Sequence, residues 1–258
     1  MTHKNVLITG GAGFFGRGFV KHLLEEGTAE RICVFSRSES RQAEMRLELG
    51  DPAKLRWFIG DIRDQDRLTR AMDGIDLVVH AAALKRIEAV EYNILEAVAT
   101  NIIGTSNVVR GAIDAGVSRA VFLSSDKACN PTTIYGMTKA IGEKVFLTAH
   151  NLAHESKRRP WNETTSFAVC RYGNVMGSTG SVLPIWQAAK LAGRRTVNTS
   201  SDAVTRFWMT LDQAVHLVEH AALNGTGNMH IPPHLPGFVL KDLATALGLL
   251  TNEVGLAA

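Results

Sequence analysis

The chain has 258 residues, of which 45% are hydrophobic and 21% charged, and its formal net charge is +3 at pH 7. This composition is typical of a globular protein with a full core, and the charge is too small and too scattered to favour nucleic acid or an anionic membrane surface as a partner. No apolar run approaches the roughly 20 residues that span a bilayer, and the three cysteines lack metal or redox spacing, so we expect a cytoplasmic protein with free thiols.

Short apolar runs alternate with amphipathic segments along the first two thirds of the chain. The pattern predicts strands at residues 5–9, 31–35, 55–59, 77–80, 120–124 and 167–171, and helices at 15–26, 64–72, 89–115 and 138–150. Nearly continuous apolar strands that alternate with helices favour a parallel sheet covered on both faces. We therefore predict an α/β fold with a Rossmann-type doubly wound sheet.

A glycine-rich turn joins the first predicted strand to the first predicted helix. Gly10, Gly13 and Gly16 permit a tight turn, and the backbone N–H groups around Phe14 and Phe15 can approach a pyrophosphate at the positive end of the helix. The strand before the turn and the helix after it favour dinucleotide binding over a merely flexible turn. The glycine spacing resembles that of the extended short-chain dehydrogenase/reductase superfamily.

The end of the second predicted strand indicates which nicotinamide cofactor binds. Ser36 and Arg37 follow that strand, Arg41 comes a turn later, and no acid stands there to hold a ribose hydroxyl. A guanidinium suits a phosphate, so NADP is favoured over NAD; the alternative is that both arginines are simply solvated.

Residues after the third and fourth predicted strands complete the expected cofactor site. Asp61 and Ile62 resemble the superfamily positions that flank the adenine, although Asp61 also suits a helix cap. The small residues Ala81, Ala82 and Ala83 would let the cofactor lie close to the backbone, or serve only for tight packing.

Tyr135 and Lys139 are the expected catalytic pair. They are four residues apart and follow the strand end at Ser125, so on a helix they share a face. An ammonium beside the phenol would lower the tyrosine pKa from about 10 and make Tyr135 a base. The alternative is a solvent-facing pair.

The surrounding residues carry a more specific resemblance. They are the runs 123–139 (LSSDKACNPTTIYGMTK), 83–86 (ALKR), 91–93 (EYN), 100–105 (TNIIGT), 171–184 (RYGNVMGSTGSVLP) and 205–213 (TRFWMTLDQ). Together they resemble the polysaccharide biosynthesis proteins that act as inverting UDP-N-acetylglucosamine 4,6-dehydratases, over nearly the whole chain.

This resemblance implies a reaction in which NADP carries a hydride from C4 of the sugar to C6. Tyr135, supported by Lys139 and Ser125, would deprotonate the 4-hydroxyl. Lys127 would then remove the C5 proton while Asp126 protonates the leaving 6-hydroxyl, and C5 would be reprotonated from the opposite face. The alternative for Asp126 and Lys127 is a neutralising pair in which both stay charged.

The same resemblance implies which residues hold the ligands. Lys85, Arg171, Asn174 and Arg206 would anchor the nucleotide sugar, with Lys85 also near the cofactor, although each alone is more often a surface charge or polar group. Asn101 matches an asparagine that organises the superfamily's active site, with a polar core contact as the alternative.

The composition changes after Arg171, where Gly173, Gly177 and Gly180 precede Pro184, and this change predicts loops and one short helix. We therefore divide the chain into an NADP-binding part, residues 1–173, and a small nucleotide-sugar-binding part, residues 174–258. Family members continue into an Arg-Pro-Gly-Glu-Lys segment that this chain lacks before Ala258, so we expect a weaker grip on the substrate and a homo-oligomer that supplies missing groups. The basic stretch 152–165 is predicted as a surface loop. The alternatives in function are a nucleotide-sugar epimerase or reductase, and a non-catalytic NADP-binding subunit.

A competing pattern lies at residues 216–220. His216, Glu219 and His220 match the H-x-x-E-H pattern of some zinc peptidases. They occupy the face opposite an apolar stripe, and the sequence indicates no third ligand. We therefore expect neither peptidase activity nor a metal.

Overall fold

The computed structural model describes residues 4–155 and 164–254. The chain forms two compact units, one of Met1–Tyr172 with Val215–Ile231 and the other of Gly173–Ala214 with Pro232–Ala258. The segment Val215–Ile231 therefore differs from the division expected from the sequence, which placed it in the second part. It belongs to the first unit because its apolar side chains, such as Val218, are buried there.

The first unit is built on a seven-stranded sheet in the order β3-β2-β1-β4-β5-β6-β9. Its strands are β1 (Asn5–Thr9), β2 (Arg31–Ser36), β3 (Leu55–Ile59), β4 (Leu77–His80), β5 (Arg119–Ser125), β6 (Ser166–Tyr172) and β9 (Met229–His230). Every neighbouring pair is parallel. This arrangement confirms the predicted doubly wound sheet, and the strand order reverses between β1 and β4, where such sheets bind ligands.

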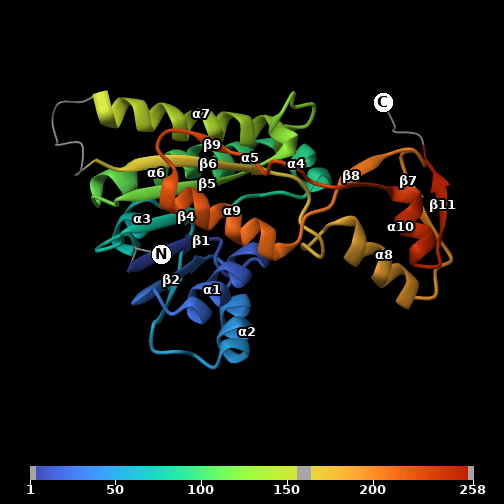
Figure 1. The fold of residues 1–258 in the computed structure, drawn as a ribbon, viewed down its shortest axis with the longest axis horizontal. Coiled ribbons are helices and arrows are strands. Elements are labelled where there is room, and N and C mark those ends of the chain that lie inside the picture. Colours follow the sequence, from blue (N-terminus) through green and yellow to red (C-terminus); the bar gives the residue numbers. More distant parts are fainter. Residues whose placement is uncertain (1–3, 156–163, 255–258) are drawn as a thin grey trace. The chain divides into compact units, whose positions relative to one another are not determined.

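Helices cover both faces of this sheet (Figure 1). They are α1 (Phe14–Glu26), α2 (Glu39–Leu49), α3 (Gln65–Ala71), α4 (Ile87–Tyr92), α5 (Ile94–Ala97), α6 (Gly104–Asp114), α7 (Ile134–Glu155) and α9 (Leu211–Asn224). Apolar side chains of α3, α6 and α7 form one core with the strands. On the other side, α1 and α9 bury their apolar faces and contact each other.

Three helix predictions need correction. The expected single helix at 89–115 is divided, because Asn93 leaves helical geometry at φ −122° and ψ 59°, and a π-helical segment, η1 (Val98–Ile103), precedes α6. The second helix, α2, was not predicted. Finally, α7 reaches Glu155, so the predicted loop begins later than residue 152; the rest of that prediction, including Lys157, lies outside the described residues.

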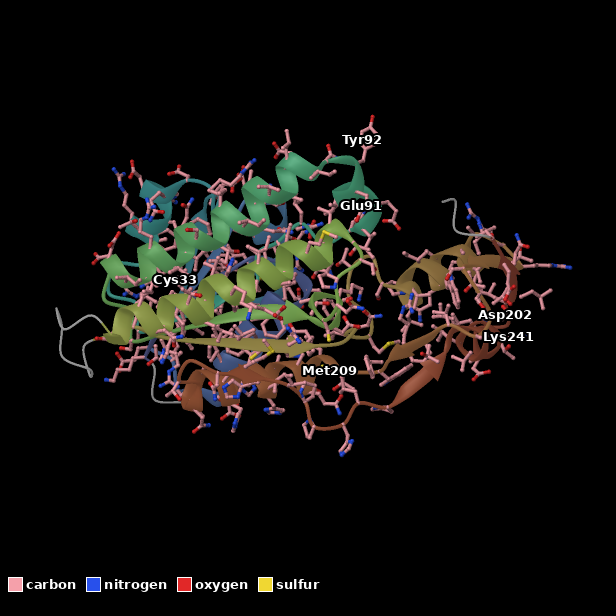
Figure 2. The ribbon with its side chains drawn as sticks, turned by 90° about the horizontal axis from the view of Figure 1, so that it is seen from above. Cys33, Glu91, Tyr92, Asp202, Met209 and Lys241 are labelled. Carbon is pink, nitrogen blue, oxygen red and sulfur yellow. The ribbon has the colours of Figure 1, made fainter. Side chains whose placement is uncertain are left out.

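The second unit is more regular than the expected loops and one short helix. It contains α8 (Val182–Leu191), α10 (Leu240–Ala246), an antiparallel pair of β8 (Thr205–Phe207) with β10 (Gly237–Val239), and a parallel pair of β7 (Thr196–Thr199) with β11 (Leu250–Glu253). Trp186, Leu243 and neighbouring apolar residues form its core. Asp202 and Lys241, labelled in Figure 2, form an ion pair of 2.7 Å on this unit.

Within the described residues, none of the helices combines the length and the apolar character needed to cross a bilayer.

Candidate active site

The glycine turn brings the ends of β1 and β4 close together. Gly10 has φ +68°, and a Cβ atom there would lie 2.8 Å from the backbone nitrogen of Ala82. The amide of Gly13 donates to the Gly10 carbonyl at 2.8 Å, and Gly13 caps the start of α1 at Phe14. A side chain at Gly10 would thus separate two strand ends, which explains the requirement for glycine at this position.

The first turn of α1 fits a pyrophosphate. Gly13 offers no side-chain cap, so the N–H groups of Phe14, Phe15 and Gly16 at the start of the helix have no partner within it. Such N–H groups at the positive end of a helix bind phosphates. The aromatic ring of Phe15 stacks on Tyr172 at 6.5 Å between centroids, so its side chain is held away from the backbone N–H groups by packing.

The end of β2 presents two exposed arginines. Arg37 and Arg41 are both exposed, and Arg37 lies 3.9 Å from Asp61. The sequence reasoning missed Gln42, which is buried and donates to the Ser36 side chain at 2.9 Å and to the Phe58 carbonyl at 2.9 Å. Gln42 thereby ties α2, which carries Arg41, to the end of β2, which Arg37 follows. The binding of a phosphate by these arginines stays a prediction.

Asp61 and Ile62 follow β3 in different environments. Burial works against the charge of Asp61, but hydrogen bonds from Arg63 outweigh it and hold the carboxyl pKa below its ordinary value. Ile62 is buried and packs against Gly104 of α6, where a Cβ atom would lie 2.7 Å from the isoleucine side chain. The contact of both residues with an adenine stays a prediction.

A buried chain of hydrogen bonds begins at the end of β1. The Thr9 hydroxyl bonds the Nδ1 atom of His80 at 2.7 Å, and the Nε2 atom of His80 bonds the Thr105 hydroxyl at 3.0 Å. Burial, aided by the charge of Lys139, lowers the pKa of His80 to about 3, so the imidazole is neutral. The Thr9 hydroxyl also accepts from the Ala82 amide at 3.3 Å, which ties the expected cofactor-binding alanines to this chain of bonds.

Asn101 extends the same chain of bonds to α7, because its backbone carbonyl accepts from the Thr105 hydroxyl at 2.6 Å. It lies in the π-helical segment η1, and its carbonyl oxygen accepts from the Leu84 amide at 2.8 Å. Its amide nitrogen donates to the Leu84 carbonyl at 2.9 Å and to the Thr138 hydroxyl at 3.0 Å, and that hydroxyl donates to the Tyr135 carbonyl at 2.9 Å. Asn101 therefore joins the segment after β4 to the start of α7.

The start of α7 is held from two sides. The carboxylate of Glu91, labelled in Figure 2 at the end of α4, accepts from the Ile134 amide at 2.7 Å. Gly136 packs against the Lys127 carbonyl so closely that a Cβ atom would clash with it. These contacts place Tyr135, the residue between Ile134 and Gly136, beside the 3₁₀ turn η2 (Asp126–Ala128).

The expected pKa of Tyr135 is wrong in direction. The residue keeps some exposure, but its hydroxyl is surrounded by protein, and this burial raises its pKa to about 12; a hydrogen bond with Ser125 opposes the shift and Asp126 adds to it. Lys139 shares the predicted helical face, but its ammonium donates to the Leu123 carbonyl at 2.6 Å and lies 4.4 Å from the centre of the Phe122 ring. Spacing along a helix gave no information on this burial.

Burial also lowers the pKa of Lys139. The side chain is 3% exposed, and burial lowers its pKa to about 7, although Glu143 raises it and Lys85 lowers it further. Lys139 therefore exchanges its proton close to neutral pH.

Ser125, Asp126 and Lys127 form one hydrogen-bonded group at the end of β5. The Ser125 hydroxyl donates to Asp126 Oδ1 at 2.8 Å, and Lys127 Nζ lies 3.1 Å from the same oxygen. The Lys127 amide donates to it as well, at 3.0 Å. The structure thus brings the predicted acid, the predicted base and Tyr135 together, with Asp126 and Lys127 in an ion pair.

Glu143 is the main site residue that the sequence reasoning missed. It is 3% exposed. Its carboxylate accepts a hydrogen bond from the Ser124 hydroxyl at 2.6 Å and two hydrogen bonds from the guanidinium group of Arg171. The signal was present in the sequence, because Tyr135, Lys139 and Glu143 follow at intervals of four residues on one helical face.

The four expected sugar-binding residues fall in both units. Lys85 belongs to the first unit, and burial of its ammonium, with repulsion from Arg86 and Lys127, lowers its pKa. Asn174 and Arg206 belong to the second unit, where Arg206 lies on β8 and donates to the Thr205 carbonyl at 2.8 Å. The substrate contacts of all four residues, including Arg171, stay predictions.

Comparisons with known proteins bear on this arrangement. Residues 6–255 match the family described as polysaccharide biosynthesis protein. A UDP-N-acetylglucosamine 4,6-dehydratase (inverting) of Campylobacter jejuni is 41% identical over 244 residues, 95% of this chain and 71% of that protein. A UDP-glucose 4-epimerase of Rickettsia canadensis is 37% identical over 247 residues, 95% of this chain and 70% of that protein. The X-ray structure of Pen from Bacillus thuringiensis has a TM-score of 0.90 and 37% identity, covering 99% of this chain and 81% of that one.

Proposed function

This chain belongs to the polysaccharide biosynthesis protein family, and from that premise we propose that it is an NADP-dependent UDP-N-acetylglucosamine 4,6-dehydratase that inverts C5. The observation that carries the proposal is the group formed by Ser125, Asp126 and Lys127 beside Tyr135. It supplies one base for the oxidation and a separate acid and base for the elimination, which a simple epimerase does not require.

NADP would lie along the ends of β1, β2 and β4. The first turn of α1 would hold the pyrophosphate, Arg37 and Arg41 the 2′-phosphate, and the backbone at Ala82 would let the ribose approach. When bound, NADP supplies a hydride acceptor for C4 of the sugar and a hydride donor for C6. The support for NADP rather than NAD is the pair of arginines after β2 with no acid between them, and their exposure leaves both guanidinium groups accessible to a phosphate.

Tyr135 is the base for the 4-hydroxyl in this proposal. With a pKa of about 12 in the protein alone, its phenol is protonated near neutral pH, so the phenolate must form after ligands bind. Ser125 would support that step by turning its hydroxyl from Asp126 Oδ1, to which it donates at 2.8 Å, to the phenolate, because a donated hydrogen bond favours the charged phenol. Lys139, with a pKa of about 7, is placed on the same helix and can release or take up a proton near neutral pH.

In this proposal Asp126 and Lys127 act in the elimination after one proton moves between them, a transfer that bound ligands must favour by desolvating the ion pair, because a lysine ordinarily holds its proton far more strongly than an aspartate does. Transfer along the 3.1 Å contact from Lys127 Nζ to Asp126 Oδ1 gives a neutral amine and a carboxylic acid. The amine then takes the C5 proton while the acid protonates the departing 6-hydroxyl, which leaves as water. The ion pair is thereby regenerated, so charge and protons balance within the two side chains.

A second candidate is a nucleotide-sugar 4-epimerase, supported by the 37% identity to the Rickettsia UDP-glucose 4-epimerase. It would use Tyr135 in the same way and leave Asp126 and Lys127 without a chemical step. A non-catalytic NADP-binding subunit would need none of the three residues. The contacts among them favour the dehydratase over both alternatives.

Mass spectrometry of the product tests the proposal. Incubation with UDP-N-acetylglucosamine and NADP is expected to give a sugar lighter by one water, with no net NADPH. Lys127→Ala should abolish water loss and keep NADP binding, whereas Lys144→Ala, an exposed lysine on α7, should behave as wild type. A product of unchanged mass would favour the epimerase, and undiminished water loss by Lys127→Ala would exclude its role as base.

We also infer that the chain forms a homo-oligomer through the α4–α5–α7 side of the first unit. Exposed apolar side chains gather on these neighbouring helices and on η1: Tyr92, Ile94, Leu95, Ile103, Met137 and Ile141. Leu95 is 82% exposed. Single apolar residues scattered over a surface need no explanation, but a contiguous group of them marks an interaction site. Light scattering of Leu95→Glu should show dissociation, and an unchanged mass would contradict this surface.

A further inference from the structure

We propose that His22, His216 and Glu219 form a binding site for a divalent first-row metal ion, with Zn²⁺ as the best fit, that joins α1 to α9. His22 comes from α1, and the other two residues stand one turn apart on α9. Each offers one ligand atom, and the three atoms lie within 4.8 Å of one another. Figure 1 shows the two helices side by side on one face of the sheet.

The distances match a tetrahedral ion. Zinc–nitrogen and zinc–oxygen bonds of 2.0–2.2 Å place neighbouring ligand atoms about 3.3–3.5 Å apart in a tetrahedron. His22 Nε2 lies 3.1 Å, and His216 Nδ1 3.7 Å, from the same carboxylate oxygen of Glu219. The two histidine nitrogens lie within 4.8 Å of each other, so the two rings would approach by at most about 1.5 Å to close the three atoms around one ion.

Only one of the two close contacts in this cluster is a hydrogen bond. The 3.1 Å contact between His22 and Glu219 is a normal hydrogen bond, but 3.7 Å is too long for one between His216 and Glu219. The two imidazole rings meet edge to face, with centroids 5.3 Å apart. Two imidazoles directed at one carboxylate form a two-histidine, one-carboxylate ligand set, which leaves a fourth position for water.

The cluster differs from the peptidase pattern in the sequence. His220, the second histidine of that pattern, lies apart from it and makes contacts with Asn224 and the His230 ring. The third ligand is instead His22, which is nearly two hundred residues away in sequence and therefore gave no signal of spacing. His22 is therefore a candidate third ligand that the sequence did not indicate.

The ion would cross-link α1 to α9. His22 lies nine residues after Gly13, the start of α1, which is about 13 Å along the helix at 1.5 Å per residue. The site is thus separate from the glycine turn. Cross-linking α1 to α9 would stabilise the folded first unit, since a metal that binds only the folded chain adds its binding free energy to folding.

Zinc titration of the untagged full chain tests the proposal. Isothermal calorimetry with ZnCl₂ in a Cys129→Ser background, which removes the exposed thiol, should detect one equivalent and a zinc-dependent rise in Tm. His216→Gln should weaken binding at least about tenfold, in line with the loss of a ligand, and remove the rise in Tm. Because the His216 side chain is 67% exposed, this variant should fold normally.

The matched control is His220→Gln, four residues further along the same helix. It should keep both the zinc affinity and the rise in Tm. His22→Gln and Glu219→Gln should behave as His216→Gln. Absence of stoichiometric zinc binding, or binding that survives His216→Gln and is lost with His220→Gln, would overturn the proposed site.

Discussion

Gly10→Ala tests the close approach of the strand ends at the expected cofactor site, and Gly27→Ala is its matched control. Gly10 and Gly27 have φ of +68° and +69°, but a Cβ atom at Gly27 meets nothing within 4 Å. At Gly10 it would lie 2.8 and 2.9 Å from the backbone nitrogen and Cα of Ala82. The two variants therefore share the backbone strain and differ in the steric clash.

The magnitudes follow from these two effects. An alanine in the left-handed region costs roughly 1–2 kcal/mol at either position, and forcing a methyl group against packed atoms adds roughly 1–3 kcal/mol at Gly10 alone. We expect the free energy of unfolding to fall by about 2–5 kcal/mol in Gly10→Ala and by about 1–2 kcal/mol in Gly27→Ala. The measurement is urea unfolding followed by circular dichroism.

Cofactor binding gives a second measurement on the same variants. Moving the backbone at Ala82 should weaken NADP binding about tenfold or more in Gly10→Ala, which corresponds to about 1.4 kcal/mol, and leave it unchanged in Gly27→Ala. Fluorescence titration measures both affinities. Equal stability losses together with equal NADP affinities would refute the inference that the glycine is needed for close approach.

Three further predictions concern buried and exposed groups. Glu143→Gln leaves the Arg171 guanidinium without its carboxylate and should lower the free energy of unfolding by about 2–4 kcal/mol. The control Glu48→Gln, at an exposed ion pair, should lower it by at most about 1 kcal/mol. Similar losses in the two variants would contradict the importance of the buried pair. The pKa of Lys139 is about 7 in the folded protein and 10.5 ordinarily, so between these pH values the unfolded chain binds one more proton than the folded chain. The free energy of unfolding of the wild type, relative to that of Lys139→Met, should therefore rise with pH across that window. A difference that stays constant with pH would contradict this prediction. Cys129 is the exposed thiol, so iodoacetamide should modify one cysteine of the native protein and none in Cys129→Ser, as mass spectrometry would detect.

The sheet was predictable because most of its strands are short apolar runs, and the central ones are buried. β1, β3 and β4 have the predicted bounds, since continuous apolar runs between turn residues leave little choice of boundary. The break near Asn93 was not predictable from periodicity, because apolar residues continue on both sides of it. The two-residue strand β9 is too short to produce a pattern.

The positions of the candidate site residues were more predictable from the sequence than their pKa values. The shared face of Tyr135 and Lys139 follows from helical spacing, but burial, which sets the pKa of both, depends on packing between distant segments. The partnership of Arg171 with Glu143 likewise requires knowing that β6 lies beside β5 and α7. Contacts between segments far apart in sequence are the part that a single sequence does not contain.

The most direct test of the proposed dehydratase is the fate of C5. UDP-N-acetylglucosamine and NADP would be incubated with the protein in deuterated water and the product analysed by NMR. The proposal predicts a 4-keto-6-deoxy sugar with deuterium at C5 and inverted configuration there. Unchanged substrate, a C4 epimer that has kept its 6-hydroxyl, or a dehydrated product that retains the C5 configuration would contradict it.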